Sequence, residues 1–82
     1  MITVLFFAQV REKIGRTQIQ LTDRTNMTTE SIRQQLSVTD VSWQQALEKD
    51  NLLVAVNQTL SDWETSVRDG DEIAFFPPIT GG

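Results

Sequence analysis

The sequence contains neither cysteine nor histidine, and the two absences narrow the chemistry open to the chain. Without cysteine there are no disulfides and no thiolate nucleophiles, and without both residues there is no zinc site built on their side chains. Every catalytic arrangement that pairs histidine with serine or cysteine is excluded as well. With only two lysines, the chain is a poor candidate for acid–base catalysis by its own side chains.

Basic residues are also scarce. Seven lysines and arginines against eleven acidic residues give a net charge of −4 and a pI near 4.5. Such a balance repels phosphate backbones, so we expect no nucleic-acid partner. The longest apolar run, Ile2–Ala8 with Thr3 inside it, is too short to cross a bilayer and has neither a basic leader nor a cleavage site. We therefore expect no membrane association and a cytoplasmic location.

The 82 residues suffice for one small domain with one core. We expect residues 1–78 to form that domain and residues 79–82 to form an extended tail. The apolar fraction of 39% is low, but 22% charge and two prolines do not indicate disorder.

Met1–Ala8 has the alternation of a β-strand, with Val4 and Phe6 on one face and Phe7 on the other. Because both faces carry large apolar groups, this strand is central in a sheet or keeps one face for a partner. Thr17–Leu21 alternates in the same way. The polar residues 9–14, followed by Gly15, indicate a long turn that joins the two strands into a hairpin.

A helix is predicted after Thr28, whose hydroxyl suits an N-cap, with Met27 and Ile32 spaced as a hydrophobic staple. A second, shorter helix follows and is capped by Asp40 or Ser42. The rest of the chain is predicted as three strands separated by turns, at residues 52–56, 59–60 and 71–76. Residues 61–68 have no regular pattern and contribute Trp63 and Val67 to the core.

This order of elements fits an α+β fold in which both helices cover one face of a mixed sheet of about five strands. The first and last strands pair in parallel at its centre. If Val4, Phe6, Ile73 and Phe75 face the main helix, Phe7 and Phe76 lie on the open face, where Leu60 can join them. We predict a docking surface there, with Arg11 beside it. Two alternatives stay open: residues 61–68 cover these rings, and Arg11 is an ordinary solvated arginine.

The chain ends in Ile79, Thr80, Gly81 and Gly82 after Pro77 and Pro78. The prolines keep the backbone extended, and glycines without Cβ atoms can enter a narrow channel in a partner. The tail is uncharged, unlike most tails that only fray, although fraying is the alternative interpretation. Asp69, Asp71 and Glu72 are interpreted as the solvated charges of a turn, and no metal site is expected.

Four segments carry a family resemblance: FFPPITGG at the end, DGDEIAFF leading into it, the internal VAVNQ and the opening VLFFAQVRE. With them, the chain resembles the small subunits of molybdopterin synthase, which are ubiquitin-like β-grasp sulfur carriers. The resemblance covers essentially the whole chain and is strongest at both ends.

The resemblance implies that Gly82 is adenylated by an ATP-using partner and converted to a thiocarboxylate. This group would then donate sulfur to cyclic pyranopterin monophosphate, so that two transfers build the dithiolene of molybdopterin. The implied partners are a large subunit carrying the catalytic side chains in a heterotetramer, a ubiquitin-activating-like adenylyltransferase and a sulfur donor enzyme. The chain itself would bind no cofactor, since Mg-ATP is used by the activating partner.

Three other functions fit the same tail. One is a sulfur carrier for another pathway, thiamine synthesis or tRNA thiolation, although the Pro-Pro before the tail argues against the thiamine carrier. Another is a ubiquitin-like modifier whose Gly82 is joined to lysines. The last is a binding module whose tail is incidental.

Overall fold

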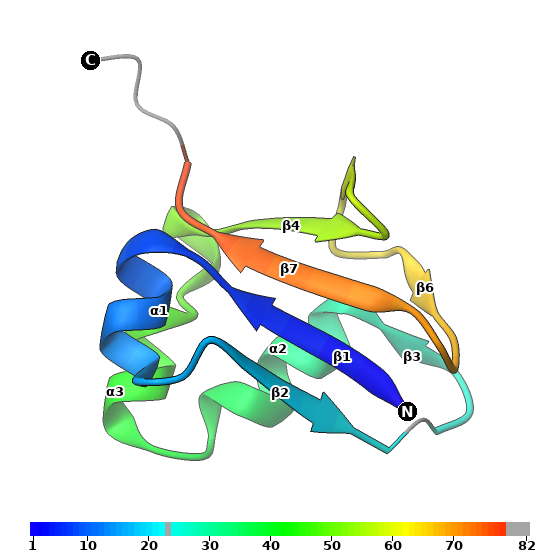
Figure 1. Cartoon of the computed structure of the whole chain (residues 1–82), viewed down its shortest axis with the longest axis horizontal. Helices are drawn as coiled ribbons and strands as arrows, with labels where there is room; N and C mark the ends of the chain where they lie inside the picture. The colour runs from blue at the N-terminus through cyan, green and yellow to red at the C-terminus, as the bar shows by residue number, and fades with distance from the viewer. Residues whose placement is uncertain (23, 79–82) are drawn as a thin grey trace.

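The computed structural model describes residues 1–22 and 24–78, and the statements below concern these residues. Five strands form one mixed sheet in the order β2-β1-β7-β4-β5, while β3 and β6 form a separate two-stranded sheet (Figure 1). The elements are β1 (Ile2–Phe6), α1 (Ala8–Ile14), β2 (Gln18–Leu21), β3 (Met27–Thr28), α2 (Thr29–Ser37), α3 (Val41–Ala46), the 3₁₀ turn η1 (Lys49–Asn51), β4 (Leu53–Val56), β5 (Thr59–Ser61), β6 (Ser66–Val67) and β7 (Glu72–Phe76). The α+β class is confirmed.

The centre of the sheet joins the two ends of the folded domain. β1 pairs in parallel with β7, so that Val4 lies opposite Ile73 and Phe6 opposite Phe75. β2 is antiparallel to β1, and β4 is antiparallel to β7. The predicted parallel pairing of the first and last strands is confirmed.

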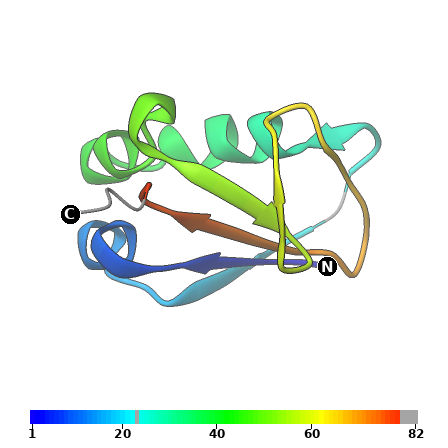
Figure 2. The same ribbon diagram turned by 90° about the horizontal axis from the view of Figure 1, so that it is seen from above.

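Helices α2 and α3 lie on one side of the sheet (Figure 2). Helix α2 begins with a capping box: the Thr28 side chain accepts from the Ser31 N–H at 3.1 Å, and the Ser31 hydroxyl accepts from the Thr28 N–H at 2.8 Å. Asp40 caps α3 by accepting from the Ser42 N–H at 2.9 Å. These capping hydrogen bonds satisfy backbone N–H groups that a helix start leaves without partners.

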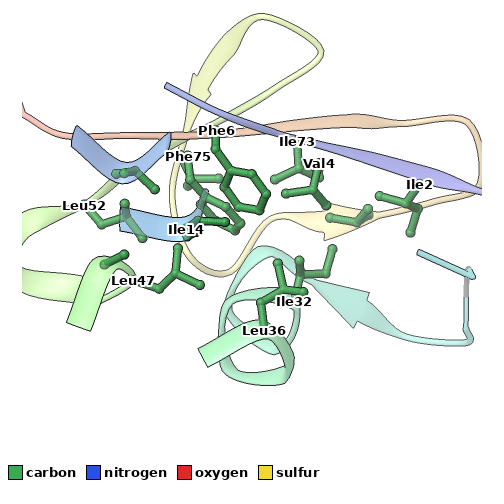
Figure 3. Packing of buried hydrophobic residues seen from close by; sticks show 14 of the residues in the cluster. Ile2, Val4, Phe6, Ile14, Ile32, Leu36, Leu47, Leu52, Ile73 and Phe75 are labelled. Atoms are coloured by element: carbon green, nitrogen blue, oxygen red, sulfur yellow. The ribbon is translucent and has the colours of Figure 1, made fainter. Parts of the chain in front are cut away.

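The core lies between the sheet and this helix layer. Figure 3 shows the labelled side chains of β1 and β7 directed toward those of α2 and toward Leu47. Phe6 and Phe75 are fully buried with ring centroids 6.3 Å apart, and the Trp63 ring stacks on Phe75 at 6.0 Å. The face predicted to pack against the main helix, which carries Val4, Phe6, Ile73 and Phe75, is therefore the one that the helices cover.

The turn predicted at residues 9–14 is wrong, because these residues form most of α1. Val10 and Ile14, four residues apart, are both buried, and the helix packs against α3. The Phe7 side chain makes no capping hydrogen bond, and Ala8 has a positive φ of 52°. The helix ends at Gly15, which has a φ of 79°. The two flanking strands still pair with each other as predicted.

The prediction that residues 61–68 are irregular is wrong at Ser61, which ends β5, and at Ser66–Val67, which pair as β6 with β3. This segment lies against the start of α2. The Thr29 hydroxyl donates to the Asp62 carbonyl at 2.7 Å, and the Glu30 N–H donates to the Trp63 carbonyl at 3.1 Å. The two predicted core residues of the segment behave as expected, since Val67 is buried and Trp63 packs against the core.

None of the helices in residues 1–22 and 24–78 has the length and apolar character needed to cross a membrane.

Candidate functional site

The open side of the sheet carries two rows of apolar residues. In the first row, Leu5 lies opposite Ala74, Ala74 opposite Ala55, and Ala55 opposite Leu60. The row therefore crosses four strands, β1, β7, β4 and β5. Side chains directly opposite one another on neighbouring strands are in contact distance, so these residues form one continuous surface.

The second row lies one step closer to the carboxyl end of β7. Phe76 is opposite Leu53, and the pairing of Phe6 with Phe75 places Phe7 beside Phe76. The Phe7 N–H donates to the Phe75 carbonyl at 3.2 Å, which continues the ladder past the end of β1. We call the two rows together the apolar sheet face; its members are Leu5, Phe7, Leu53, Ala55, Leu60, Ala74 and Phe76.

The apolar sheet face is accessible. Phe7 and Leu60 are 44% and 68% exposed, and its other five members are half-buried. Residues 61–68 lie against α2, so they do not cover it. The alternative that this segment hides the rings is therefore wrong, and Phe7, Leu60 and Phe76 share one face as predicted. A surface of several neighbouring apolar side chains is typical of a protein–protein contact.

A polar row borders the apolar sheet face at one end. Thr3 lies opposite Gln20 on one neighbouring strand and opposite Glu72 on the other. Beyond it, Asp71 accepts from the Arg68 N–H at 2.8 Å and from the Asn57 amide at 3.1 Å. These two hydrogen bonds, the first of them foremost, lower the pKa of Asp71. This polar row lies at the start of β7, so the apolar sheet face extends from it toward the carboxyl end of β7, where Phe76 lies.

The chain leaves the sheet at that open end. Pro77 is half-buried and Pro78 exposed, and both follow β7 directly. The predicted site residues Ile79, Thr80, Gly81 and Gly82 lie outside the described residues. The structure thus brings Pro77 and Pro78 next to Phe76 and the apolar sheet face, while the four tail residues stay a prediction.

Arg11 lies in α1, where its N–H donates to the Phe7 carbonyl one turn earlier at 3.3 Å. Its side chain is exposed. It belongs to none of the salt bridges found among the described residues. Arg11 is thus near Phe7 but on a helix, not on a strand of the apolar sheet face. The pairing of Arg11 with a partner carboxylate stays a prediction.

A groove that the sequence did not predict flanks Pro77 and Pro78. It has a volume of about 680 Å³ and lies between α1 and the α3–η1 region, with Val10, Lys13 and Glu48 among its lining residues. The sequence analysis interprets residues 9–14 as a turn, so it predicts no helix that could form one side of this groove. The i,i+4 spacing of Val10 and Ile14 is the one signal that could have indicated the helix. Sequence reasoning likewise missed Leu53 and Ala55, whose place on the open face depends on register.

The carboxylates at the opposite end of the sheet have structural partners. Asp69 pairs with the N-terminal ammonium of Met1, and Asp71 holds the turn described above. Among residues 1–22 and 24–78, no three potential ligands come together in a group that could hold a metal ion.

The fold is that of the ubiquitin-like β-grasp class. Its features are a mixed sheet of five strands, helices on one face of that sheet, and parallel pairing of the first and last strands. Solved structures support this class. One of them is the complex of subunits 1 and 2 of molybdopterin-converting factor from Helicobacter pylori. A chain of this complex matches with a TM-score of 0.70 and 22% identity, over 99% of this chain and 97% of that one. The modifier SAMP1 from Haloferax volcanii matches with a TM-score of 0.76 and 24% identity, over 99% and 98%.

The ThiS family model matches residues 4–82. Molybdopterin synthase sulfur carrier subunits from Haemophilus influenzae and Escherichia coli are 56% and 49% identical, each over the full length of both chains. The chain belongs to the ThiS family.

Proposed function

We propose that this chain is the sulfur carrier subunit of molybdopterin synthase. One observation carries the proposal: the apolar sheet face includes Phe76, the last residue of β7, and β7 is the strand that continues through Pro77 and Pro78 into the Gly81–Gly82 tail. A partner that docks on this face is therefore in place to receive the tail. The full-length relatives at 56% and 49% identity, which carry that function in their names, support the same conclusion.

The first step of the proposed chemistry makes a poor electrophile reactive. A carboxylate oxygen of Gly82 attacks the α-phosphorus of Mg-ATP on a ubiquitin-activating-like adenylyltransferase, and pyrophosphate leaves. A hydrosulfide equivalent from a sulfur donor enzyme then attacks the carbonyl carbon. The C–S bond forms, the C–O bond to AMP breaks, and a thiocarboxylate remains on Gly82.

The second step uses the thiocarboxylate sulfur as a nucleophile toward a carbon of cyclic pyranopterin monophosphate that carries an oxygen substituent. The new C–S bond replaces a C–O bond, and the oxygen leaves as water or as an oxygen of the phosphate group. After the new C–S bond forms, water cleaves the acyl–sulfur bond and returns Gly82 as a carboxylate. Two such transfers provide both sulfurs of the dithiolene. Proton transfers belong to side chains of the large subunit, in agreement with the lack of histidine and cysteine here. The working assembly is a heterotetramer of two large and two small subunits.

Intact-mass measurement tests the proposal. The purified chain is incubated with Mg-ATP, the host adenylyltransferase and sulfide, beside a variant that lacks Gly82. We expect a gain of about 16 Da, one oxygen exchanged for sulfur, in the full-length chain alone. An enzyme that is active on a known carrier but adds no mass to this chain would contradict the proposal.

The acceptor is tested separately. The thiocarboxylated chain is mixed with the large subunit and cyclic pyranopterin monophosphate, and the product is measured together with the return of the carrier to its original mass. Loss of the 16 Da without molybdopterin indicates a carrier for another pathway. Conjugates to lysines in cell extract indicate a modifier.

A further inference from the structure

Strand β2 (Gln18–Leu21) is the last strand on its side of the sheet in the part of the chain that the structure describes. The pairing with β1 fixes which backbone groups point outward. The Phe6 N–H donates to the Thr17 carbonyl at 3.0 Å, so Thr17 and, by alternation, Ile19 and Leu21 direct their backbone groups toward β1. The N–H and C=O groups of Gln18 and Gln20 therefore point away from the sheet.

This edge has few of the features that usually prevent a second chain from pairing there. β2 contains no proline, no charged side chain and no bulge in its register with β1. Ile19 and Leu21 are half-buried on the helix side of the sheet, where they pack against the core. An added strand can extend this apolar strip while it satisfies the outward backbone groups of Gln18 and Gln20.

The charge around β2 differs in sign from the rest of the chain. Residues 11–24 contain four of the seven basic residues and two of the eleven acidic ones, a net charge of +2, while the remaining residues carry −6. Arg16 precedes β2 and Arg24 follows it, and both are exposed. Arg24 also lines a hollow of about 450 Å³, together with Met27 of β3 and Gln34 of α2. A cationic group thus stands beyond each end of the strand.

We propose that the free edge of β2 binds an extended acidic peptide segment of a partner protein by strand addition. The peptide backbone pairs with Gln18 and Gln20, its apolar side chains continue the strip of Ile19 and Leu21, and its flanking carboxylates meet Arg16 and Arg24. A second copy of this chain is a poorer occupant, because antiparallel β2–β2 pairing brings Arg16 of one copy near Arg24 of the other.

This contact is separate from the proposed sulfur chemistry. β2 lies at the edge opposite β5, which carries Leu60, and the tail leaves from β7 between them. A partner held at β2 leaves the outer strand β5 of the apolar sheet face uncovered. The proposal does not depend on the function of Gly82.

The test uses the full chain labelled with nitrogen-15 and a synthetic peptide, Asp-Glu-Val-Thr-Ile-Thr-Val-Glu-Asp. We expect amide shift changes at residues 16–22 and slowed amide exchange at Gln18 and Gln20. Arg16→Glu combined with Arg24→Glu should weaken peptide binding at least tenfold. Arg68→Glu, a single charge reversal outside residues 11–24, should leave it unchanged. A peptide with lysine in place of its four acidic residues should bind at least tenfold more weakly.

Gln20→Pro tests the backbone contact, because it removes one outward N–H at an edge position where proline is tolerated. A thermal unfolding curve shows whether this variant is folded, and the arginine variants keep the test decisive if it is not. The proposal would be overturned if millimolar peptide caused no amide shift changes, or if the changes appeared on the apolar sheet face instead. Equal binding of the lysine peptide, or sedimentation that shows dimers joined through β2, would also overturn it.

Discussion

The two faces of the central sheet are built from the same strands, but one is buried and the other is accessible to solvent. On one face, Phe6, Ile73 and Phe75 are at most 1% exposed beneath the helices. On the other, Leu5, Ala74 and Phe76 alternate with them and carry a surface that no described segment covers. Apolar character alone therefore does not identify the core; what separates the two faces is the helix layer over one of them.

The largest effect should come from the covered face. Phe75→Ala removes a ring that stacks on Phe6 and Trp63 and leaves a cavity at the centre of the sheet. We expect a loss of about 3–5 kcal/mol in the free energy of unfolding. Urea denaturation followed by tryptophan fluorescence measures it. A loss below about 1 kcal/mol would show that this face is not the core.

The next largest effect should come from a substitution on the open face, and it should change binding affinity. Phe76→Asp places a charge in the apolar sheet face next to the tail, so partners that dock there must desolvate it. We expect affinity for the large subunit and for the adenylyltransferase to fall by roughly 30-fold, about 2 kcal/mol. Calorimetry measures binding, and circular dichroism shows that the fold is kept.

Gln20→Glu is the matched control for Phe76→Asp. It adds one negative charge to the same side of the sheet, but in the polar border opposite Thr3. It should leave both affinities within twofold of wild type. If Phe76→Asp binds both partners normally, the apolar sheet face is not the docking surface.

The smallest effect concerns charges that hold the helix layer. Glu30 accepts hydrogen bonds from Arg33, and Lys49 lies 3.4 Å from the same carboxylate. Arg33 also donates to the Leu47 carbonyl at 2.9 Å and stands over the Trp63 ring at 5.9 Å. The hydrogen bond from Arg33, with the charges of Arg33 and Lys49, lowers the pKa of Glu30 below 4.5 despite partial burial.

Because the folded-state pKa of Glu30 is lowered, its contribution to stability is complete above pH 4.5 and is lost as the pH falls through the folded-state value. Glu30→Gln should therefore lower stability at pH 7 and reduce the decline of stability with acid below pH 4.5. Urea midpoints at several pH values measure both. Glu64→Gln, which removes an exposed carboxylate outside this network, is the control, and an equal decline in Glu30→Gln and wild type would contradict the assignment.

The sequence predicted the elements that carry their own signals. Alternation in β1 and β7 indicated two strands and assigned Phe6 and Phe75 to the core, and Thr28 marked the start of α2. The same alternation placed Phe7 and Phe76 on the open face. These predictions succeeded because each depends on neighbouring residues in the chain and on the period of a strand or a helix cap.

The elements that were missed depend on distant partners. Helix α1 has seven residues and no side-chain cap, and it is stabilised by packing against α3. A helix this short is marginal alone, so its sequence carries little signal. β6 is two residues long and exists through pairing with Met27 and Thr28. Leu53 and Ala55 joined the apolar sheet face only when the register of β4 with β7 was known.

The parallel pairing of β1 with β7 also sets an order of events during synthesis. Residues 3–6 leave the ribosome early, but their central neighbours are residues 72–75. Non-local pairing must wait until both partners are present. β1 is therefore synthesised long before β7, and until then β2 is the one neighbouring strand of the described sheet that can pair with it. The apolar sheet face and the core are completed together by β7, the strand that leads into the tail, so a chain without β7 cannot present the complete apolar sheet face.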